Sequence, residues 1–174
     1  MSIPKNEAVA PEQVMGSCEG FELHRPRSGE ILLVARASGV TERASLERIA
    51  SLDANDAACW RDHGYGVWLL VDPSSRLKLG WCGLRAGDTP EDPELMYTLT
   101  PPARGKGYAT RAARAAVERA FANPAIRSVW ACTDINHVAS VAVMERAGMA
   151  FERQGEVYGV MRLIYRIRRP PREP

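Results

Sequence analysis

The sequence has little excess charge of either sign. Its 174 residues include 23 Lys and Arg against 21 Asp and Glu, which gives a formal net charge of +2. A dedicated nucleic-acid-binding protein presents a basic surface, and no tract of Lys and Arg interleaved with aromatic residues is visible. We therefore expect no nucleic-acid partner.

Long apolar runs are also missing. The run at residues 67–71 is typical, and it is far shorter than the ~20 apolar residues that a bilayer-spanning helix needs. Residues 1–14 mix apolar residues with Pro, Lys, Asn and Glu, and they contain no stretch that could serve as a secretory signal. These observations predict a cytoplasmic protein with no membrane partner.

Cysteine and histidine are sparse and scattered. No C-x-x-C pair occurs, and the cysteines and histidines do not form the ligand set of a metal site. We expect reduced, mostly buried thiols, isolated histidines and no metal site. The residues concerned are Cys18, Cys59, Cys82, Cys132, His24, His63 and His137.

What is present fits one folded domain. Apolar residues make up 45% and charged residues 25% of the chain, which is ordinary for a globular protein. A chain of this length buries about 70% of the surface of its unfolded form, so it needs no disulfide or bound metal to fold. The ends are polar, Pro-containing and unpatterned. We expect a flexible N-terminal arm at 1–17, a single domain at 18–168 and a disordered tail at 169–174.

Hydrophobic periodicity predicts strands and helices in a mixed order. Strands are expected at 21–24, 30–36, 66–71, 77–84, 94–99, 128–133, 149–154 and 157–167, and helices at about 41–63, 107–123 and 137–147. Such an order indicates an α/β or α+β domain around one central sheet.

Residues 101–110, Pro-Pro-Ala-Arg-Gly-Lys-Gly-Tyr-Ala-Thr, join a predicted strand to a predicted helix. The two glycines let the backbone turn tightly and approach a ligand closely. The helix start presents unpaired N–H groups and the positive end of its dipole, and Arg104 and Lys106 add full charges. Phosphate or pyrophosphate is the ligand that such an anion site favours.

Two other phosphate-binding motifs fit this segment less well. The P-loop spacing is absent, because no glycine precedes Gly105 at the required distance and neither Ser nor Thr follows Lys106. The dinucleotide fingerprint G-x-G-x-x-G/A nearly starts at Gly105, but Thr110 occupies its last position. A glycine-rich turn with ordinary surface cations is the plain alternative.

The segment resembles the signature of the GCN5-related N-acetyltransferase (GNAT) superfamily, Gln/Arg-x-x-Gly-x-Gly/Ala, at Arg104, Gly107 and Ala109. The resemblance extends over 64–168. It is most like the branch of ribosomal-protein N-terminal acetyltransferases. Outside the signature it is carried by Glu94, Tyr97, Pro101, Thr133-Asp134-Ile135-Asn136, Ser140 and Glu145-Arg146-Ala147-Gly148.

This resemblance implies a mixed, mostly antiparallel central sheet that is splayed in the middle, with helices on both faces. Acetyl-CoA, as co-substrate, would lie between the 94–99 and 128–133 strands, with its pyrophosphate on the amides of 104–109 and its pantetheine arm along Leu99. Asn136 would contact the arm or the acetyl end, or it is simply a helix cap. The expected cofactor contacts are Leu99, Arg104, Gly105, Lys106, Gly107, Tyr108, Ala109, Thr110, Asn136 and Ser140.

Acetylation of an amine needs its neutral form, whereas an α-amine has a pKa of about 7.7–8.0 and is largely protonated. Glu94 is the candidate general base, acting through a water, unless it is only a surface charge on an edge strand. A backbone N–H near 98–99 would meet the developing oxyanion. Many family members protonate the departing thiolate with a tyrosine, where this chain has Met144. Ser140, Tyr97, Tyr158 or water must then do so.

The expected function is transfer of acetyl from acetyl-CoA to a primary amine, directly within a ternary complex. The acceptor is a protein N-terminus, a polyamine or a small-molecule amine, and the protein is a monomer or homodimer. A non-catalytic acyl-CoA-binding or sensing domain is the alternative.

Overall fold

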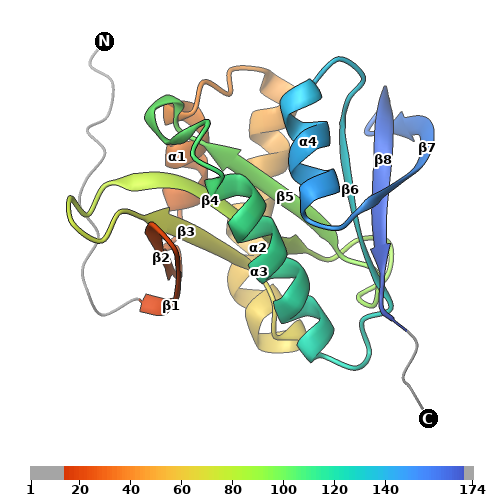
Figure 1. Cartoon of the computed structure of the whole chain (residues 1–174), viewed down its shortest axis with the longest axis horizontal. Coiled ribbons are helices and arrows are strands. Elements are labelled where there is room, and N and C mark those ends of the chain that lie inside the picture. The colour runs from red at the N-terminus through yellow and green to blue at the C-terminus, as the bar shows by residue number, and fades with distance from the viewer. Residues whose placement is uncertain (1–13, 171–174) are drawn as a thin grey trace.

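The computed structural model describes residues 14–170, which form one eight-stranded sheet with helices on both faces (Figure 1). The strand order is β1-β2-β3-β4-β5-β6-β8-β7, and neighbours are antiparallel except for the parallel pair β5 and β6. The predicted fold class is confirmed. The strands are Val14–Cys18 (β1), Phe21–His24 (β2), Val67–Val71 (β3), Lys78–Arg85 (β4), Glu94–Leu99 (β5), Ser128–Asp134 (β6), Ala150–Val157 (β7) and Val160–Arg168 (β8).

The helices form two layers. In Figure 1, α3 and α4 lie in front of the sheet, and α1 and α2 lie behind it. Each layer buries its own apolar cluster, one including Trp68 and Met144 and the other including Ile31 and Trp81. The bounds are Glu30–Ala37 (α1), Arg43–His63 (α2), Tyr108–Ala122 (α3) and Val138–Arg146 (α4), with a short 3₁₀ helix, η2, at Pro101–Ala103.

The sheet is splayed between β5 and β6. Strand β5 pairs with β4 along its whole length, from Glu94 to Leu99, whereas it pairs with β6 only where Glu94 faces Trp130. Strand β6 pairs along its length with β8. The remainder of β5 therefore presents one edge that no neighbouring strand covers, as the family resemblance implied.

Alternate residues of β5 face different helix layers. Met96 packs in the α1–α2 cluster, whereas Leu95, Tyr97 and Leu99 pack in or against the α3–α4 cluster. Because side chains alternate across a strand, Glu94 lies on the α1–α2 side together with Met96. This one strand thus carries two chemically different faces.

The strand predicted at 30–36 is wrong, because these residues form α1. Ile31, Val34 and Ala35 are buried while Leu33 is exposed, which is the three-to-four spacing of a helix and not the alternation of a strand. Gly29, in the left-handed conformation at φ 86°, begins the helix, and its N–H donates to Asp53 at 2.5 Å. Because residues 31–35 are all apolar, the sequence alone did not distinguish this helical spacing from a strand.

The predicted boundaries of the domain shift at both ends. Residues 14–17 belong to β1, so they are not part of an arm, and residues 1–13 lie outside the described residues. Arg169 follows β8 and donates to the backbone oxygens of Ile126 and Asn123, so it is not disordered. Residues 171–174 of the predicted tail also lie outside the described residues.

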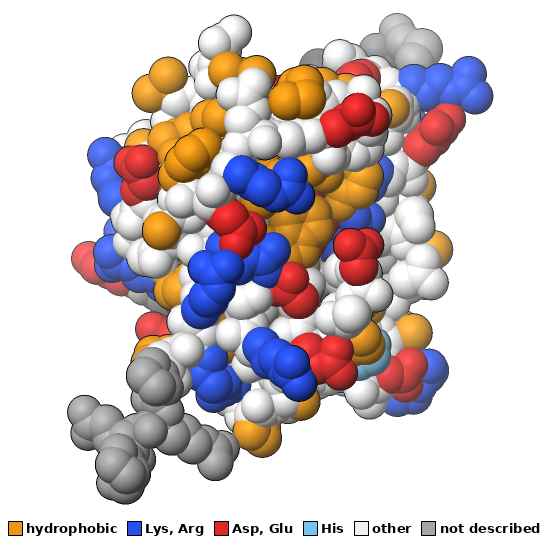
Figure 2. All heavy atoms as spheres, turned by 90° about the vertical axis from the view of Figure 1, so that its right-hand side faces the viewer, with side chains coloured by type: hydrophobic (Ala, Val, Ile, Leu, Met, Phe, Trp, Pro, Cys, Tyr) orange, Lys and Arg blue, Asp and Glu red, His pale blue; other side chains and the backbone are white. Residues whose placement is uncertain are grey.

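Charges of both signs are interspersed on the face formed by β7 and β8. Figure 2 shows Lys and Arg beside Asp and Glu around a central group of hydrophobic side chains. Several of them pair across strands: Arg166 contacts Asp92 and Glu152, and Arg162 contacts Asp134. This face therefore carries no field of a single sign.

Residues 14–170 include neither a membrane-spanning helix nor a metal-binding cluster. Within this range no helix combines the length and apolar character needed to cross a membrane. Nor do three or more His, Cys, Asp or Glu side chains of the same range gather where they could hold a metal ion.

Candidate active site

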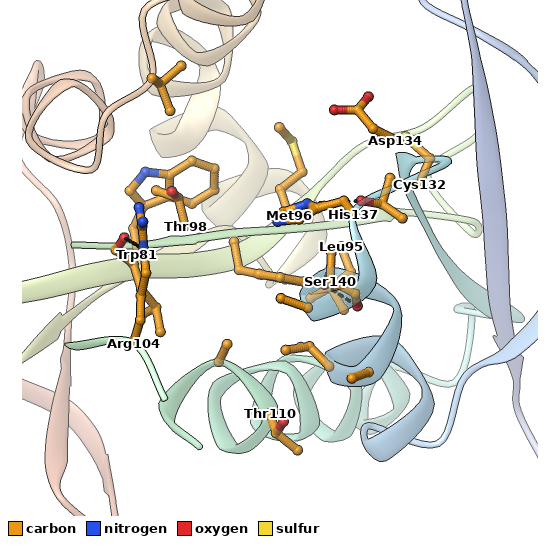
Figure 3. A pocket seen from close by; sticks show the side chains of 18 of the residues that line it. Trp81, Leu95, Met96, Thr98, Arg104, Thr110, Cys132, Asp134, His137 and Ser140 are labelled. Atoms are coloured by element: carbon orange, nitrogen blue, oxygen red, sulfur yellow. Dashed lines mark hydrogen bonds between the residues drawn. The ribbon is translucent and has the colours of Figure 1, made fainter. Parts of the chain in front are cut away.

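A cavity of about 720 Å³ opens along the uncovered edge of β5. Its walls come from α2 and the residue stretch before it, β5, the loop leading into α3, the end of β6, and α4. In Figure 3, Trp81, Met96 and Thr98 lie on one side of β5, and Ser140 and Thr110 lie on the other. The predicted residues that line it are Glu94, Leu99, Arg104, Gly105, Gly107, Tyr108, Ala109, Thr110 and Ser140.

The loop before α3 forms a cradle of backbone donors. Gly105 and Gly107 both have left-handed φ angles, 75° and 74°, which glycine adopts at little cost. Within residues 14–170, no acceptor contacts the N–H groups from Gly105 to Thr110. Because α3 runs for 15 residues from Tyr108, its dipole adds positive potential at the same place. The cradle fits a phosphate-rich group.

The two cations of the signature are placed differently. Arg104 lines the cavity, and its guanidinium donates to the carbonyl oxygens of Leu99 at 3.2 Å and Ser38 at 2.7 Å. Lys106 is exposed and does not line the cavity. Arg111 instead supports the loop from α3, because it donates to the Lys106 carbonyl at 3.0 Å. The position of Arg111, one turn into the predicted helix, gave no signal of this role.

Asn136 and Ser140 were both predicted to contact the cofactor, and only Ser140 reaches the cavity. Asn136 is exposed and is absent from the cavity wall. It is not the cap of α4 either, because His137 holds that position. Ser140 is 8% exposed in the first turn of α4. The turn from Asp134 to His137 places the helix start one residue later than the sequence suggested.

Tyr97 reaches across the cavity from β5 to α4. Its hydroxyl lies 2.7 Å from Ser140 Oγ and donates to the Ser140 carbonyl at 3.1 Å. Burial raises the pKa of the Tyr97 phenol well above its ordinary value of 10.0, so the group stays protonated. The pair presents one hydroxyl, that of Ser140, whose hydrogen can turn toward a ligand.

Glu94 is almost fully buried, at 3% exposed, so it is not an edge-strand surface charge. Its Oε2 accepts hydrogen bonds from Arg85 Nε at 2.8 Å and from the Tyr158 hydroxyl. Among residues 14–170, its Oε1 accepts only from the Cys132 thiol, at 3.6 Å. Burial raises the pKa of that thiol to about 12, which makes Cys132 a protonated, unreactive neighbour. Oε1 is therefore the oxygen available for proton transfer.

Tyr158 lies beside Glu94, a contact that could not be expected from the sequence. It lies in the turn between β7 and β8 at φ 55°, a left-handed conformation that is strained for a bulky residue. Its hydroxyl contacts Arg85 as well as Glu94, and burial raises its pKa well above 10.0. The turn thus delivers a permanently protonated hydroxyl to the carboxylate.

Met144 does not take over the role of the tyrosine that protonates the departing thiolate in many family members. Its side chain is fully buried, at 0% exposed, in the α3–α4 cluster. Val143 and Arg146 are the neighbouring residues of α4 that line the cavity. On this helix, Ser140 is the hydroxyl residue of the cavity wall.

The gap in the sheet brings a backbone cradle that fits a phosphate-rich group and a buried carboxylate into one cavity. The chain belongs to the GNAT acetyltransferases, because residues 33–150 match the family model described as "Acetyltransferase (GNAT) domain". It is accordingly an N-acetyltransferase.

Solved structures share the fold of this chain. A GNAT-family acetyltransferase from Bordetella pertussis has a TM-score of 0.72 and 18% identity, covering 88% of this chain and 98% of that one. Ribosomal-protein-S5-alanine acetyltransferase from Vibrio fischeri has a TM-score of 0.71 and 13% identity, covering 91% and 98%. A phosphinothricin acetyltransferase from Sinorhizobium meliloti, in complex with acetyl-CoA, has a TM-score of 0.67 and 18% identity, covering 86% and 88%.

Proposed function

We propose that the protein transfers acetyl from acetyl-CoA to a primary amine by direct attack within a ternary complex. The observation that carries the proposal is the division of β5 into two faces around one cavity. Tyr97 meets Ser140 of the α4 wall on one face, and Glu94 meets Arg85 and Tyr158 on the other. Two reactants can therefore approach one point from opposite sides.

Acetyl-CoA fits the α3–α4 side. The free N–H groups from Gly105 to Thr110 would hold the pyrophosphate, and the uncovered edge of β5 near Leu99 would pair with the amide groups of the pantetheine arm. Arg104 bonds to the Leu99 carbonyl and so braces this edge. Acetyl-CoA supplies an activated acetyl group whose thiol is a fair leaving group, with a pKa of about 8.5.

Glu94 fits the role of general base on the α1–α2 side. Its Oε1 would take a proton from the acceptor ammonium, directly or through a water, so that the neutral nitrogen attacks the thioester carbonyl. Arg85 and Tyr158 hold Oε2, which fixes the carboxylate in one orientation. As the new C–N bond forms and the C–S bond breaks, the attacking nitrogen loses its second proton to water and the thiolate departs. Glu94 then releases the first proton to solvent, which restores the carboxylate.

The Ser140 hydroxyl is the candidate donor to the departing sulfur. Tyr97 lies within hydrogen-bond distance of it and keeps it oriented. Since the pKa of the Tyr97 phenol is raised, that group acts as a positioning donor and not as a strong acid.

The test is an assay of free thiol released from acetyl-CoA across a panel of amines. Wild-type protein should release thiol with at least one class of acceptor and should be stabilised against heat by CoA. Glu94→Gln should keep CoA stabilisation and lose on the order of 100-fold or more in kcat. CoA stabilisation without turnover of any amine would identify a non-catalytic acyl-CoA-binding domain instead.

A further inference from the structure

Arg48, in the wall of the cavity, combines a guanidinium without an acidic partner and a buried N–H without an acceptor, both within the described residues. Arg48 of α2 lines the cavity and forms no ion pair within residues 14–170, and its buried Nε–H has no hydrogen-bond acceptor there. The carboxylates of the same wall are engaged elsewhere: Glu94 pairs with Arg85, and Asp134 pairs with Arg162.

Glu42 is the remaining carboxylate of the cavity wall. It is exposed, and its Oε2 accepts a hydrogen bond from the Ser45 hydroxyl at 2.7 Å. A solvated carboxylate contributes little Coulomb energy to a charge that it does not contact. The guanidinium of Arg48 therefore faces the cavity with no contacting carboxylate among the described residues.

An aromatic ring holds the Arg48 guanidinium in place. Its central carbon lies 4.6 Å from the centre of the Tyr158 ring, and that of Arg85 lies 5.0 Å from the same ring. A cation–π contact fixes the plane of a guanidinium while leaving its N–H groups free to bind an anion. The hydroxyl of this same tyrosine donates to Glu94. Tyr158 thus sets the separation between the anion-binding group and the general base.

A second unpartnered donor lines the same cavity. The indole of Trp81 is 1% exposed, and within the described residues its buried Nε1–H has no acceptor. Trp81 stands opposite Thr98, so it lies on the α1–α2 side of the sheet with Glu94. A buried donor without an acceptor is unusual in a folded protein. Arg162, which pairs with Asp134, adds a third such donor to the cavity wall, and the three together indicate a ligand that brings acceptor atoms.

We propose that the acceptor amine carries an anionic group of the carboxylate or phosphate class, which binds Arg48 with Trp81 as a second donor. This inference rests on the proposed function and names its substrate class. The amine would lie at Glu94, and the anion would lie at Arg48, whose guanidinium rests on the ring of the tyrosine that contacts Glu94. A guanidinium offers a planar pair of donors that matches two oxygens of either anion. A polyamine would place a further ammonium against Arg48, where like charges repel.

The experiment measures kcat/KM with matched acceptors that differ only in the anionic group. The pairs are γ-aminobutyrate with its amide and phosphoethanolamine with ethanolamine, which also separate carboxylate from phosphate. Spermidine and a short peptide amide with a free N-terminus complete the panel. Each is assayed with wild type, Arg48→Gln, Arg48→Lys and the control Arg43→Gln, which changes an exposed arginine of the same helix. Comparing the ratio within a pair across the variants cancels differences in intrinsic amine reactivity.

Wild type should prefer the anionic member of at least one pair. Arg48→Gln should lower that preference by about 10- to 100-fold, Arg48→Lys should retain part of it, and Arg43→Gln should leave it unchanged. The KM for acetyl-CoA should stay the same in all four proteins. Faster turnover of spermidine or the neutral amines by wild type, or an equal loss on both members of a pair, would overturn the inference alone. An absence of thiol release with every acceptor would overturn the proposed function as well.

Discussion

The hydroxyl of Tyr158 donates a hydrogen bond to the carboxylate of Glu94, although 64 residues separate the two in the chain. The contact joins the turn between β7 and β8 to the first residue of β5. It exists because the turn holds Tyr158 in a left-handed conformation, at φ 55°. Strain of this kind persists where the surrounding structure determines it, and it is common at functional sites.

Tyr158→Phe tests whether this contact orients Glu94. The substitution keeps the ring on which Arg48 rests and removes the hydroxyl. Because the residue is partly exposed, we expect a loss of about 1 kcal/mol in the free energy of unfolding. The carboxylate loses one of its fixed donors, so kcat should fall by about 10-fold while the KM for acetyl-CoA stays constant.

Tyr65→Phe is the matched control. Its hydroxyl donates to the Pro90 carbonyl at 3.0 Å and does not line the cavity. Urea unfolding should show a loss of similar size, with kcat unchanged. Equal kcat in wild type and Tyr158→Phe would show that Glu94 needs no such support.

Ser140→Ala and Tyr97→Phe test the leaving-group side. Their hydroxyls lie 2.7 Å apart, so the two substitutions should not be additive. Ser140→Ala should lower kcat by about 10-fold, since a thiol is already a fair leaving group and gains little from an acid. The double variant should be little worse than Ser140→Ala in single-turnover measurements. A fully additive loss would place the two hydroxyls in separate roles.

Gly107→Ala tests the phosphate cradle. At φ 74° an added Cβ costs about 1–2 kcal/mol, and it would lie 3.2 Å from the Arg111 guanidinium. The loop should distort, and the dissociation constant for CoA should rise by about 10-fold. Gly64→Ala introduces a similar backbone strain, at φ 73°, where α2 ends and away from the cavity. Calorimetric titration should show normal CoA affinity for that control, and normal affinity for Gly107→Ala would speak against the cradle.

The loop and helix start on the proposed cofactor side were predictable because they are local in sequence. A turn with two glycines, a helix start and a strand that ends at a proline pair all lie within residues 94–110, and each has a physical signature. The acceptor side was not predictable in this way. Arg85 and Tyr158 meet across 73 residues, and their contact depends on how a hairpin turn folds over the sheet.

The misplaced features have physical reasons as well. The apolar run at 30–36 reads as a strand until the exposure of Leu33 reveals a helical period. Asn136 has the side chain of a helix cap, but the turn before α4 gives that position to His137. Residue type alone does not decide between two adjacent caps when the preceding turn fixes the backbone.

Asp56 should make the stability of the protein depend on pH. It is 5% exposed and accepts from the Val67 N–H at 2.7 Å. Burial raises its pKa to about 6, against about 3.9 in an unfolded chain. Between these values the folded state binds the extra proton, so the free energy of unfolding falls as pH rises from about 4 to about 6.

Asp56→Asn removes this dependence of stability on pH. The variant should therefore gain on the order of 2 kcal/mol relative to wild type between pH 4 and pH 7.5, measured by urea unfolding. A difference between the two proteins that stays constant with pH, or falls as pH rises, would show that Asp56 is ionised in the folded state throughout this range.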